Sequence, residues 1–256
     1  MGCTSAPLFL SYYISFKSAT GGLMKKLLLA VLFALAATPL FAGMNSDFIN
    51  SVNAGGFADY NRDISTLIGQ ADFHTGKGVS FPGFDVGASV SAVKTSSDSV
   101  SEEYQYLPFI TAETQIPILG MGVALRGTSY DDFQSIGAGL KWHGSLALIN
   151  LSASAFYDRY KTDYYDGNHY SASASASVNV LFLTPYVGIG YDYSEMETKN
   201  FDFRDNYGNL IRKTDDGVMR YTAGVNFHPL PLVYVYGAYT YTKYNHGFQG
   251  GLGINF

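Results

Sequence analysis

Stretches in which apolar and small polar residues alternate one by one run through most of this sequence. Over 171–180, every second residue is alanine or valine and the others are serine or asparagine. Alternate side chains of a β-strand point to opposite faces of a sheet, so each stretch predicts a strand with one apolar and one polar face. Such strands build either a soluble sandwich or a closed barrel whose apolar face meets lipid.

A pattern near the start of the chain predicts a secretory signal peptide over 24–42. The basic residues of 24–26 precede the apolar run 27–37, and small residues before Gly43 supply a cleavage site. The alternative is an anchor in the inner membrane. That anchor needs about 20 apolar residues, and the run is too short.

Residues 1–23 do not fit this plan, because a signal peptide begins close to its basic residues. We interpret them as an upstream extension of a protein that starts at Met24. The alternative is a precursor with an N-terminal extension. The intact mass of the precursor separates the two, since a precursor starting at Met1 contradicts our interpretation.

Charge and cysteine content limit the partners and the chemistry. Cleavage removes three of the 16 basic residues, namely Lys17, Lys25 and Lys26, and none of the 21 acidic ones, leaving 13 against 21 and a net charge of −8. An acidic chain without a basic cluster argues against nucleic acid as a partner. The single cysteine, Cys3, lies upstream of the signal peptide, so we expect no disulfide, no thiolate metal site and no lipoprotein anchor.

Alternation predicts ten strands from residue 84 onward. They are 84–93, 106–116, 122–130, 134–142, 147–160, 170–181, 185–194, 217–228, 232–242 and 248–256. Each has roughly the 9–11 residues that cross an outer membrane. Tight turns and longer polar loops fall at opposite ends, as in barrels whose turns face the periplasm. The longest loop, 195–216, is therefore expected outside the cell.

Aromatic residues gather near both ends of the predicted strands. Those at the loop end are Tyr104, Tyr106, Tyr130, Phe133, Tyr160, Tyr193, Tyr241, Tyr244 and Phe248, and those at the turn end are Phe84, Trp142, Phe182, Phe227 and Phe256. Two such belts are expected at the two surfaces of a membrane. A soluble sandwich does not explain them.

Two short stretches resemble known families. The final strand ends on Phe256 and resembles the C-terminal signature of bacterial, Gram-negative outer-membrane β-barrel proteins, which implies recognition of Phe256 by barrel-assembly machinery. The stretch 83–85, Gly-Phe-Asp, resembles the start of the first strand in a group of porin-like proteobacterial barrels with an N-terminal helical segment. That group has no settled activity to carry over.

The stretch 43–83, ahead of the barrel, is predicted to be helical. Apolar residues recur at helical spacing and predict a helix over 58–69, with Gly69 at its C-cap. The predicted fold is all-β: a single antiparallel transmembrane β-barrel of about ten strands over 84–256, with a short N-terminal helical segment.

This helical segment is a candidate plug for the lumen. Many inward positions are small, and ten strands enclose more space than the eight that side chains alone fill. A plugging helix would set Asn61, Arg62 and Asp63 among the inward charges. The alternative places the helix in the periplasm or on the membrane surface.

Six charged residues fall on the polar faces of six predicted strands and form the candidate lumen lining. They are Asp85, Glu113, Arg126, Lys141, Asp192 and Arg220. A charge inside a membrane barrel is costly unless it is hydrated or paired. The six either line a solute path or form an ion-pair network that fills the lumen. A symmetric turn at 117–121 predicts that Glu113 pairs with Arg126.

Candidate catalytic and metal sites are weak. Asp163, Asp166 and His169 share one predicted outside loop, but omptin-type proteases draw such residues from several strands that project beyond the membrane, and these strands barely exceed membrane length. None of the histidines pairs with a lipid-facing serine, and there is no GxSxG motif. The oxygen-rich loop 202–209 lacks the spacing of an EF-hand. We expect no catalytic residues, cofactor or metal.

The sequence thus predicts an exported protein of the cell outer membrane that is not an enzyme. A narrow porin-like channel or transporter for a small solute is favoured. A closed-lumen structural or surface-binding barrel is the alternative, and a barrel enzyme is the third class. Outer-membrane lipid is the expected partner in every case.

Overall fold

The computed structural model describes residues 44–53, 56–73, 79, 83–96, 104–116, 121–199, 203–204 and 210–255. Two helices come first, α2 (Met44–Asn53) and α3 (Phe57–Gln70). The predicted signal peptide, the residues upstream of it and Phe256 lie outside the described residues. Within the described residues, no helix is long and apolar enough to cross a membrane.

Ten long strands follow the helices, in the predicted order. They are β1 (Phe84–Lys94), β2 (Tyr104–Ile116), β3 (Met121–Tyr130), β4 (Phe133–Leu146), β5 (Ile149–Lys161), β6 (Tyr165–Val178), β7 (Leu183–Thr198), β10 (Lys213–Leu230), β11 (Val233–Thr242) and β12 (His246–Asn255). A short hairpin of β8 (Phe203–Arg204) and β9 (Leu210–Ile211) stands between β7 and β10.

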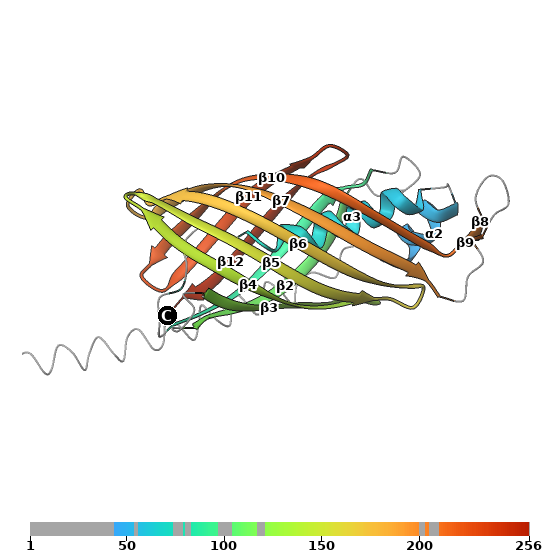
Figure 1. Cartoon of the computed structure of the whole chain (residues 1–256), viewed down its shortest axis with the longest axis horizontal. Coiled ribbons are helices and arrows are strands. Elements are labelled where there is room, and N and C mark those ends of the chain that lie inside the picture. Colours follow the sequence, from blue (N-terminus) through green and yellow to red (C-terminus); the bar gives the residue numbers. More distant parts are fainter. Residues whose placement is uncertain are drawn as a thin grey trace, which may run out of the picture. The chain divides into compact units, whose positions relative to one another are not determined.

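The ten strands close into an antiparallel barrel (Figure 1), in the order β1-β12-β11-β10-β7-β6-β5-β4-β3-β2. The closing seam runs from Asp85 opposite Asn255 to Val93 opposite Gly247. The predicted ten-stranded barrel with a short N-terminal helical segment is confirmed. We call the end that carries the connections after β2, β4, β6 and β10 the turn end, and the opposite end the loop end.

Burial alternates along the strands as the sequence alternates. In β6, Ser171 and Ser173 are buried, whereas Ala172 and Ala174 are exposed. The outer wall is apolar, and Ile136, for example, is 72% exposed. Lipid can cover such an apolar surface, whereas contact with water would be unfavourable for it.

Three strands are longer at the loop end than predicted. β6 has 14 residues, β7 has 16 and β10 has 18. Their added residues alternate between buried inward positions and polar outward ones, such as His169 and Asp166 in β6. Because the outward residues of these segments are polar rather than apolar, the segments lack the apolar–polar alternation of the other strands and were predicted as loops. The expectation that the strands barely exceed membrane length was wrong.

Three of the predicted belt aromatics, Tyr130, Phe133 and Tyr160, face inward instead. Phe133 and Tyr160 are fully buried, and their rings stack with centroids 5.7 Å apart. Each is separated from the outward residues of its strand by an odd number of positions. Its position in the alternation, rather than its aromatic character, therefore determines that it faces the lumen. Tyr157, three positions before Tyr160 and two before the outward Arg159, faces outward and is 45% exposed.

Candidate functional site

Helix α3 lies inside the barrel. It contacts β1, β2, β6, β7 and β10, and eleven of its residues are buried (Figure 1). Both the apolar Leu67 and the polar Thr66 are fully buried, so the helix is covered on more than one side. Its observed bounds, Phe57–Gln70, extend the predicted 58–69 by one residue at each end, and Ala71 rather than Gly69 is the C-cap.

Directly after α3, Asp72 bridges two opposite walls of the barrel. Its Oδ1 accepts from Arg126 Nη1 at 2.5 Å, and its Oδ2 accepts from Arg220 Nη2 at 2.9 Å. Arg126 is on β3 and Arg220 on β10, and four strands separate β3 from β10 in either direction around the ring. The two ion pairs therefore span the lumen.

Asp72 closes a ring of six ionisable groups, which we call the charge ring. Its members are Asp72, Arg126, Asp158, His169, Asp192 and Arg220. Arg126 binds Asp158 with two hydrogen bonds of 2.7 and 2.6 Å, and Arg220 binds Asp192 with two of 2.8 and 3.1 Å. His169 stands between the two carboxylates, 3.0 Å from Asp158 and 3.5 Å from Asp192.

The charge ring is buried, with side-chain exposures of 0 to 1%. Unpaired charges at such depth are very costly, and removing one partner of a buried pair leaves the other uncompensated. Three carboxylates face two guanidinium groups in the ring. Protonation of His169 balances the charge of the ring, because the imidazolium stands between two carboxylates and hydrogen-bonds Asp158 through Nδ1.

A glycine and an aromatic ring fit the segment against the wall. Phe73 packs under the Arg220 guanidinium, with the ring centroid 4.9 Å from Cζ. Gly188 of β7 also lies against this ring, and an added Cβ there would meet the Phe73 ring at 2.8 Å. The small inward residues of the barrel therefore make room for the helical segment.

A second polar cluster lies toward the turn end. Glu113 accepts from Lys141 Nζ at 3.0 Å and lies 2.8 Å from His143 Nε2. Asp85 accepts from the Tyr234 hydroxyl at 2.7 Å. A cavity of about 10 Å³ between this cluster and Ala71 has room for about one water molecule.

The start of α3 is held at the loop end by uncharged groups. The hydroxyls of Tyr60 and Tyr165 are 2.9 Å apart, and Asn61 donates to the carbonyl of Ser194 at 3.1 Å. Phe48 of α2 packs on the Tyr165 ring with centroids 4.6 Å apart.

Two charged residues of α3 also bind loop-end groups. Asp63 accepts from the Ser96 backbone N–H at 2.9 Å, from the Ser96 hydroxyl and from Asn245 Nδ2 at 2.6 Å. Burial raises the pKa of Asp63 to about 6, because its effect exceeds that of these hydrogen bonds, which lower the pKa. Arg62 Nε pairs with Asp216 at 2.7 Å. Asn61, Arg62 and Asp63 are thus placed at the loop end and do not contact the charge ring.

All six residues of the candidate lumen lining are buried on inward faces, but they form two groups. Arg126, Asp192 and Arg220 belong to the charge ring. Glu113 and Lys141 form an ion pair near the turn end, and Asp85 binds Tyr234. No ion pair joins one group to the other within the described residues.

The predicted pair of Glu113 and Arg126 was wrong. Glu113 stands opposite Ala124, and Arg126 opposite Thr111. Ile116 pairs directly with Met121, so four residues separate the paired ends instead of the six that a pairing of Glu113 with Arg126 implies, and the register shifts by two. A shift of two keeps both residues inward but gives each a different partner.

Three members of the charge ring escaped sequence reasoning. Asp158 continues the inward parity of Ser154, so its side could have been inferred. His169 was assigned to a loop with Asp163 and Asp166, but it lies in β6, facing inward, whereas Asp166 faces outward. The grouping of these three residues was therefore wrong. Asp72 follows the helix and belongs to no periodic pattern.

Within the described ranges, no group of three or more His, Cys, Asp or Glu side chains is arranged to hold a metal ion. The loop 202–209 lies outside the described residues except for Phe203 and Arg204.

The profile of the family named outer membrane protein beta-barrel domain matches residues 64–256. The chain belongs to this family. As a member of the outer membrane protein beta-barrel domain family, it is a protein of the outer membrane. A comparison with curated protein sequences found no match.

Solved barrels show limited likeness. The N-terminal β-barrel domain of Pseudomonas aeruginosa OprF is 13% identical, with 68% of this chain and 97% of that chain covered and a TM-score of 0.37. The translocator domain of NalP from Neisseria meningitidis is 13% identical, with 82% and 99% covered and a TM-score of 0.45. Ail of Yersinia pestis is 17% identical, with 68% and 97% covered and a TM-score of 0.34. Likenesses at this level do not bear on function.

Proposed function

We propose that this member of the family is a closed-lumen barrel in which residues 57–73 act as the plug. The observation that carries the proposal is the bridge from Asp72 to Arg126 and Arg220 on opposite walls. A solute moving along the lumen would have to break these two buried ion pairs. This closed-lumen function was the alternative to a porin in the sequence-based prediction.

The hydrogen bonds of the helical segment support a docked plug. Polar contacts join it to the barrel near its start, at Asn61 and Asp63, and after its end, at Asp72. Between them, the apolar Ile64 and Leu67 are fully buried. The segment is therefore held at both ends, and the hydrogen bonds of the charged Asp72 contribute about 1.5–3 kcal/mol each.

Conduction of a small solute stays a prediction, and it applies to a state in which residues 57–73 have moved out of the lumen. Without Asp72, Arg126 still has Asp158 and Arg220 still has Asp192, so the wall keeps its internal ion pairs. A barrel without the plug would therefore keep its inward charges paired and gain space along its axis. Recognition by barrel-assembly machinery through Phe256 likewise stays a prediction, as does the absence of enzymatic activity.

Planar-bilayer conductance tests the proposal. The refolded mature protein should be closed, with rare or no openings, and deletion of 44–80 should give a large, steady conductance. Heat-modifiable gel mobility should be the same for both and serves as the folding control. A steady conductance of the full-length mature barrel, unchanged by the deletion, would refute the plug.

A further inference from the structure

A row of three tyrosines marks the membrane boundary on one side of the outer wall. Tyr157, Tyr170 and Tyr193 are direct cross-strand neighbours on β5, β6 and β7. Their ring centroids are 5.2 and 6.2 Å apart. Tyrosines of membrane proteins gather where hydrocarbon meets head groups, so this tyrosine row gives the level of that interface.

The tyrosine hydroxyls bind polar residues beyond the row. Tyr157 donates to Asn168 Oδ1 at 2.9 Å, and Tyr193 donates to Asp215 Oδ2 at 3.2 Å. Both acceptors lie further toward the loop end. A ring on the lipid-facing wall with its hydroxyl aimed at polar groups is the expected arrangement at an interface.

Arg159 and Lys161 stand on the outer face of β5, two and four residues beyond Tyr157. Two residues advance a strand by about 7 Å. With a tilt of about 35–45°, this places them roughly 5 and 10 Å above the tyrosine row. Each head-group layer is about 5–7 Å thick. The two cations therefore lie in and just above the head groups.

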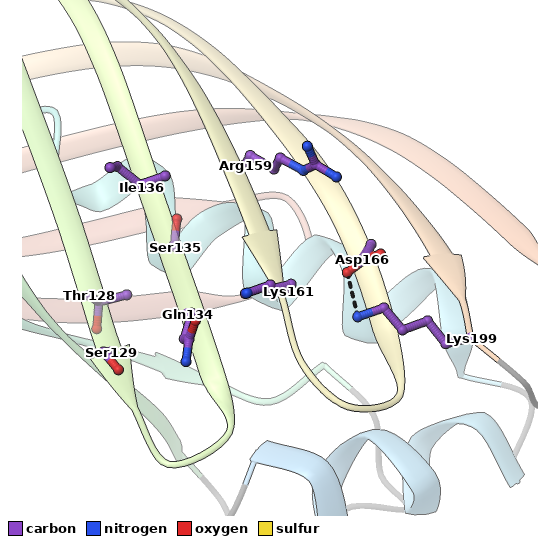
Figure 2. A pocket seen from close by; sticks show the side chains of 9 residues that line it. All are labelled: Thr128, Ser129, Gln134, Ser135, Ile136, Arg159, Lys161, Asp166 and Lys199. Atoms are coloured by element: carbon purple, nitrogen blue, oxygen red, sulfur yellow. Dashed lines mark ion pairs between the residues drawn. The ribbon is translucent and has the colours of Figure 1, made fainter.

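An open pocket of about 720 Å³ surrounds them (Figure 2). It is lined by three cationic side chains, those of Arg159, Lys161 and Lys199, and by one carboxylate, that of Asp166. Lys199 is already engaged, since it pairs with Asp166 at 2.6 Å and donates to the carbonyl of Thr162 at 2.7 Å. Its dashed ion pair is visible in Figure 2.

Arg159 and Lys161 differ from Lys199 in this respect. Across the described part of the chain, neither makes a hydrogen bond or an ion pair, and both side chains are exposed. Their cross-strand neighbours on β6 are Asn168 and Asp166. Asp166 is paired with Lys199, so Arg159 and Lys161 are the two cations of the pocket that form no ion pair among the described residues. The nearest further carboxylates on this face are Glu195 and Glu197, one strand beyond Asn168 and Asp166.

The lower rim of the pocket is apolar. Ile136, directly opposite Arg159 on β4, lines the pocket and is 72% exposed. Leu140, further toward the turn end on the same face, is 49% exposed. An occupant that combines an anion with hydrocarbon fits both parts, because the pocket opens onto the lipid-facing wall.

We infer that this pocket binds a phosphate group on the head group of a lipid in the outer leaflet. The fork of Arg159 matches phosphate oxygens with two parallel hydrogen bonds, and Lys161 adds a point charge. The inference rests on the outer-membrane location and on the loop end facing the exterior, as in outer-membrane barrels generally. It does not depend on the proposed plug.

The neighbouring wall supplies a matched control. Glu195, Glu197 and Asp215 make the outer face of β7 and β10 acidic, and Lys213 there is paired with Glu195 at 3.4 Å. Replacing Arg212 and Lys213 by glutamine removes the same charge as replacing Arg159 and Lys161. Both pairs are exposed, so neither double variant should disturb the barrel.

The test uses the full-length mature protein in phosphatidylcholine vesicles that contain a small fraction of diphosphorylated lipid A. Lipid retained after transfer to detergent is counted by native mass spectrometry. The R159Q/K161Q variant should bind this lipid at least about tenfold more weakly than wild type, as expected for the loss of charge-assisted contacts to phosphate. The R212Q/K213Q variant should change binding less than about twofold.

Three results would overturn the inference. Equal retention of dephosphorylated lipid A would remove the role of phosphate. Equal losses of lipid binding in the two double variants would show that binding depends on the net charge of the protein and not on this pocket. Full displacement of the lipid by soluble pyrophosphate at a similar concentration would make the occupant a soluble anion. Unchanged heat-modifiable mobility of each variant shows that the barrel has folded.

Discussion

Gly69 of α3 and Asp192 of β7 approach each other so closely that no side chain fits between them. A Cβ added to Gly69 would lie 2.5 Å from Asp192 Cγ. Asp192 cannot turn away without loss, because both of its oxygens accept from Arg220. Glycine at this position therefore lets the backbone of the helix lie against a buried carboxylate.

Replacing Gly69 by alanine should push α3 away from the wall. Overpacking costs about 1–3 kcal/mol, so excursions of the helix should become roughly 5- to 100-fold more frequent. Ser65 is 1% exposed, so a cysteine placed there reports undocking through its rate of thiol labelling. The control is G237A in β11, where an added Cβ meets nothing nearer than 3.9 Å. Equal labelling in both variants would contradict the tight contact.

Replacing Asp72 by asparagine should release the helix without unfolding the barrel. The variant loses charge-assisted hydrogen bonds to two arginines, worth about 1.5–3 kcal/mol each. Both arginines keep a carboxylate on the wall, so the mobility of the folded barrel on gels should not change. Channel openings in planar bilayers should rise roughly a hundredfold. D59N, which removes the same charge from a surface ion pair on α3, should have little effect.

The docking of α3 should weaken as the pH rises through about 6. Burial raises the pKa of Asp63 to about 6 from 3.8, so the protonated carboxyl favours the docked state. This contribution is complete below about pH 4 and is lost above the raised pKa. Labelling of a cysteine at position 65, normalised to the unfolded chain at each pH, should be faster at pH 7.5 than at pH 5. In D63N the difference should disappear; if it persists, another group is responsible.

Glu113 should be coupled energetically to Lys141 and not to Arg126. The Glu113–Lys141 pair is buried and 3.0 Å long, whereas Arg126 binds Asp72 and Asp158 instead. A double-mutant cycle of E113Q and K141Q in urea unfolding should give about 0.5–3 kcal/mol of interaction energy. The cycle of E113Q and R126Q should be additive to within about 0.5 kcal/mol. The reverse ranking would restore the register predicted from the sequence.

Strand parity was predictable because it depends on each residue's immediate neighbours. Serine and alanine in strict alternation define both faces of β6 without any knowledge of the other strands. Partners across strands depend on the turn between them, and one residue more or less moves every pair. The register of β2 against β3 was therefore wrong although Glu113 and Arg126 were both correctly placed on the inner face.

The charge ring could not be derived in the same way. Its other members lie on five different strands, and they are joined through Asp72. Asp72 follows a helix and is not part of any periodic sequence pattern. The inward charges Arg126, Asp192 and Arg220 were recognisable as costly and in need of partners. Their partners became visible only when the ring of strands brought β3 and β10 to opposite sides of α3.

The continuous wall around α3 also constrains biogenesis. Strand β1 is hydrogen-bonded to β2 on one side and to β12 on the other, so no lateral opening admits a helix carrying Tyr60 and Leu67. During assembly, the wall must close around the helix, or the helix must enter lengthwise through one end. Because α3 precedes β1 in the chain and β12 comes last, formation of the β1–β12 seam sets the moment after which the helix is enclosed.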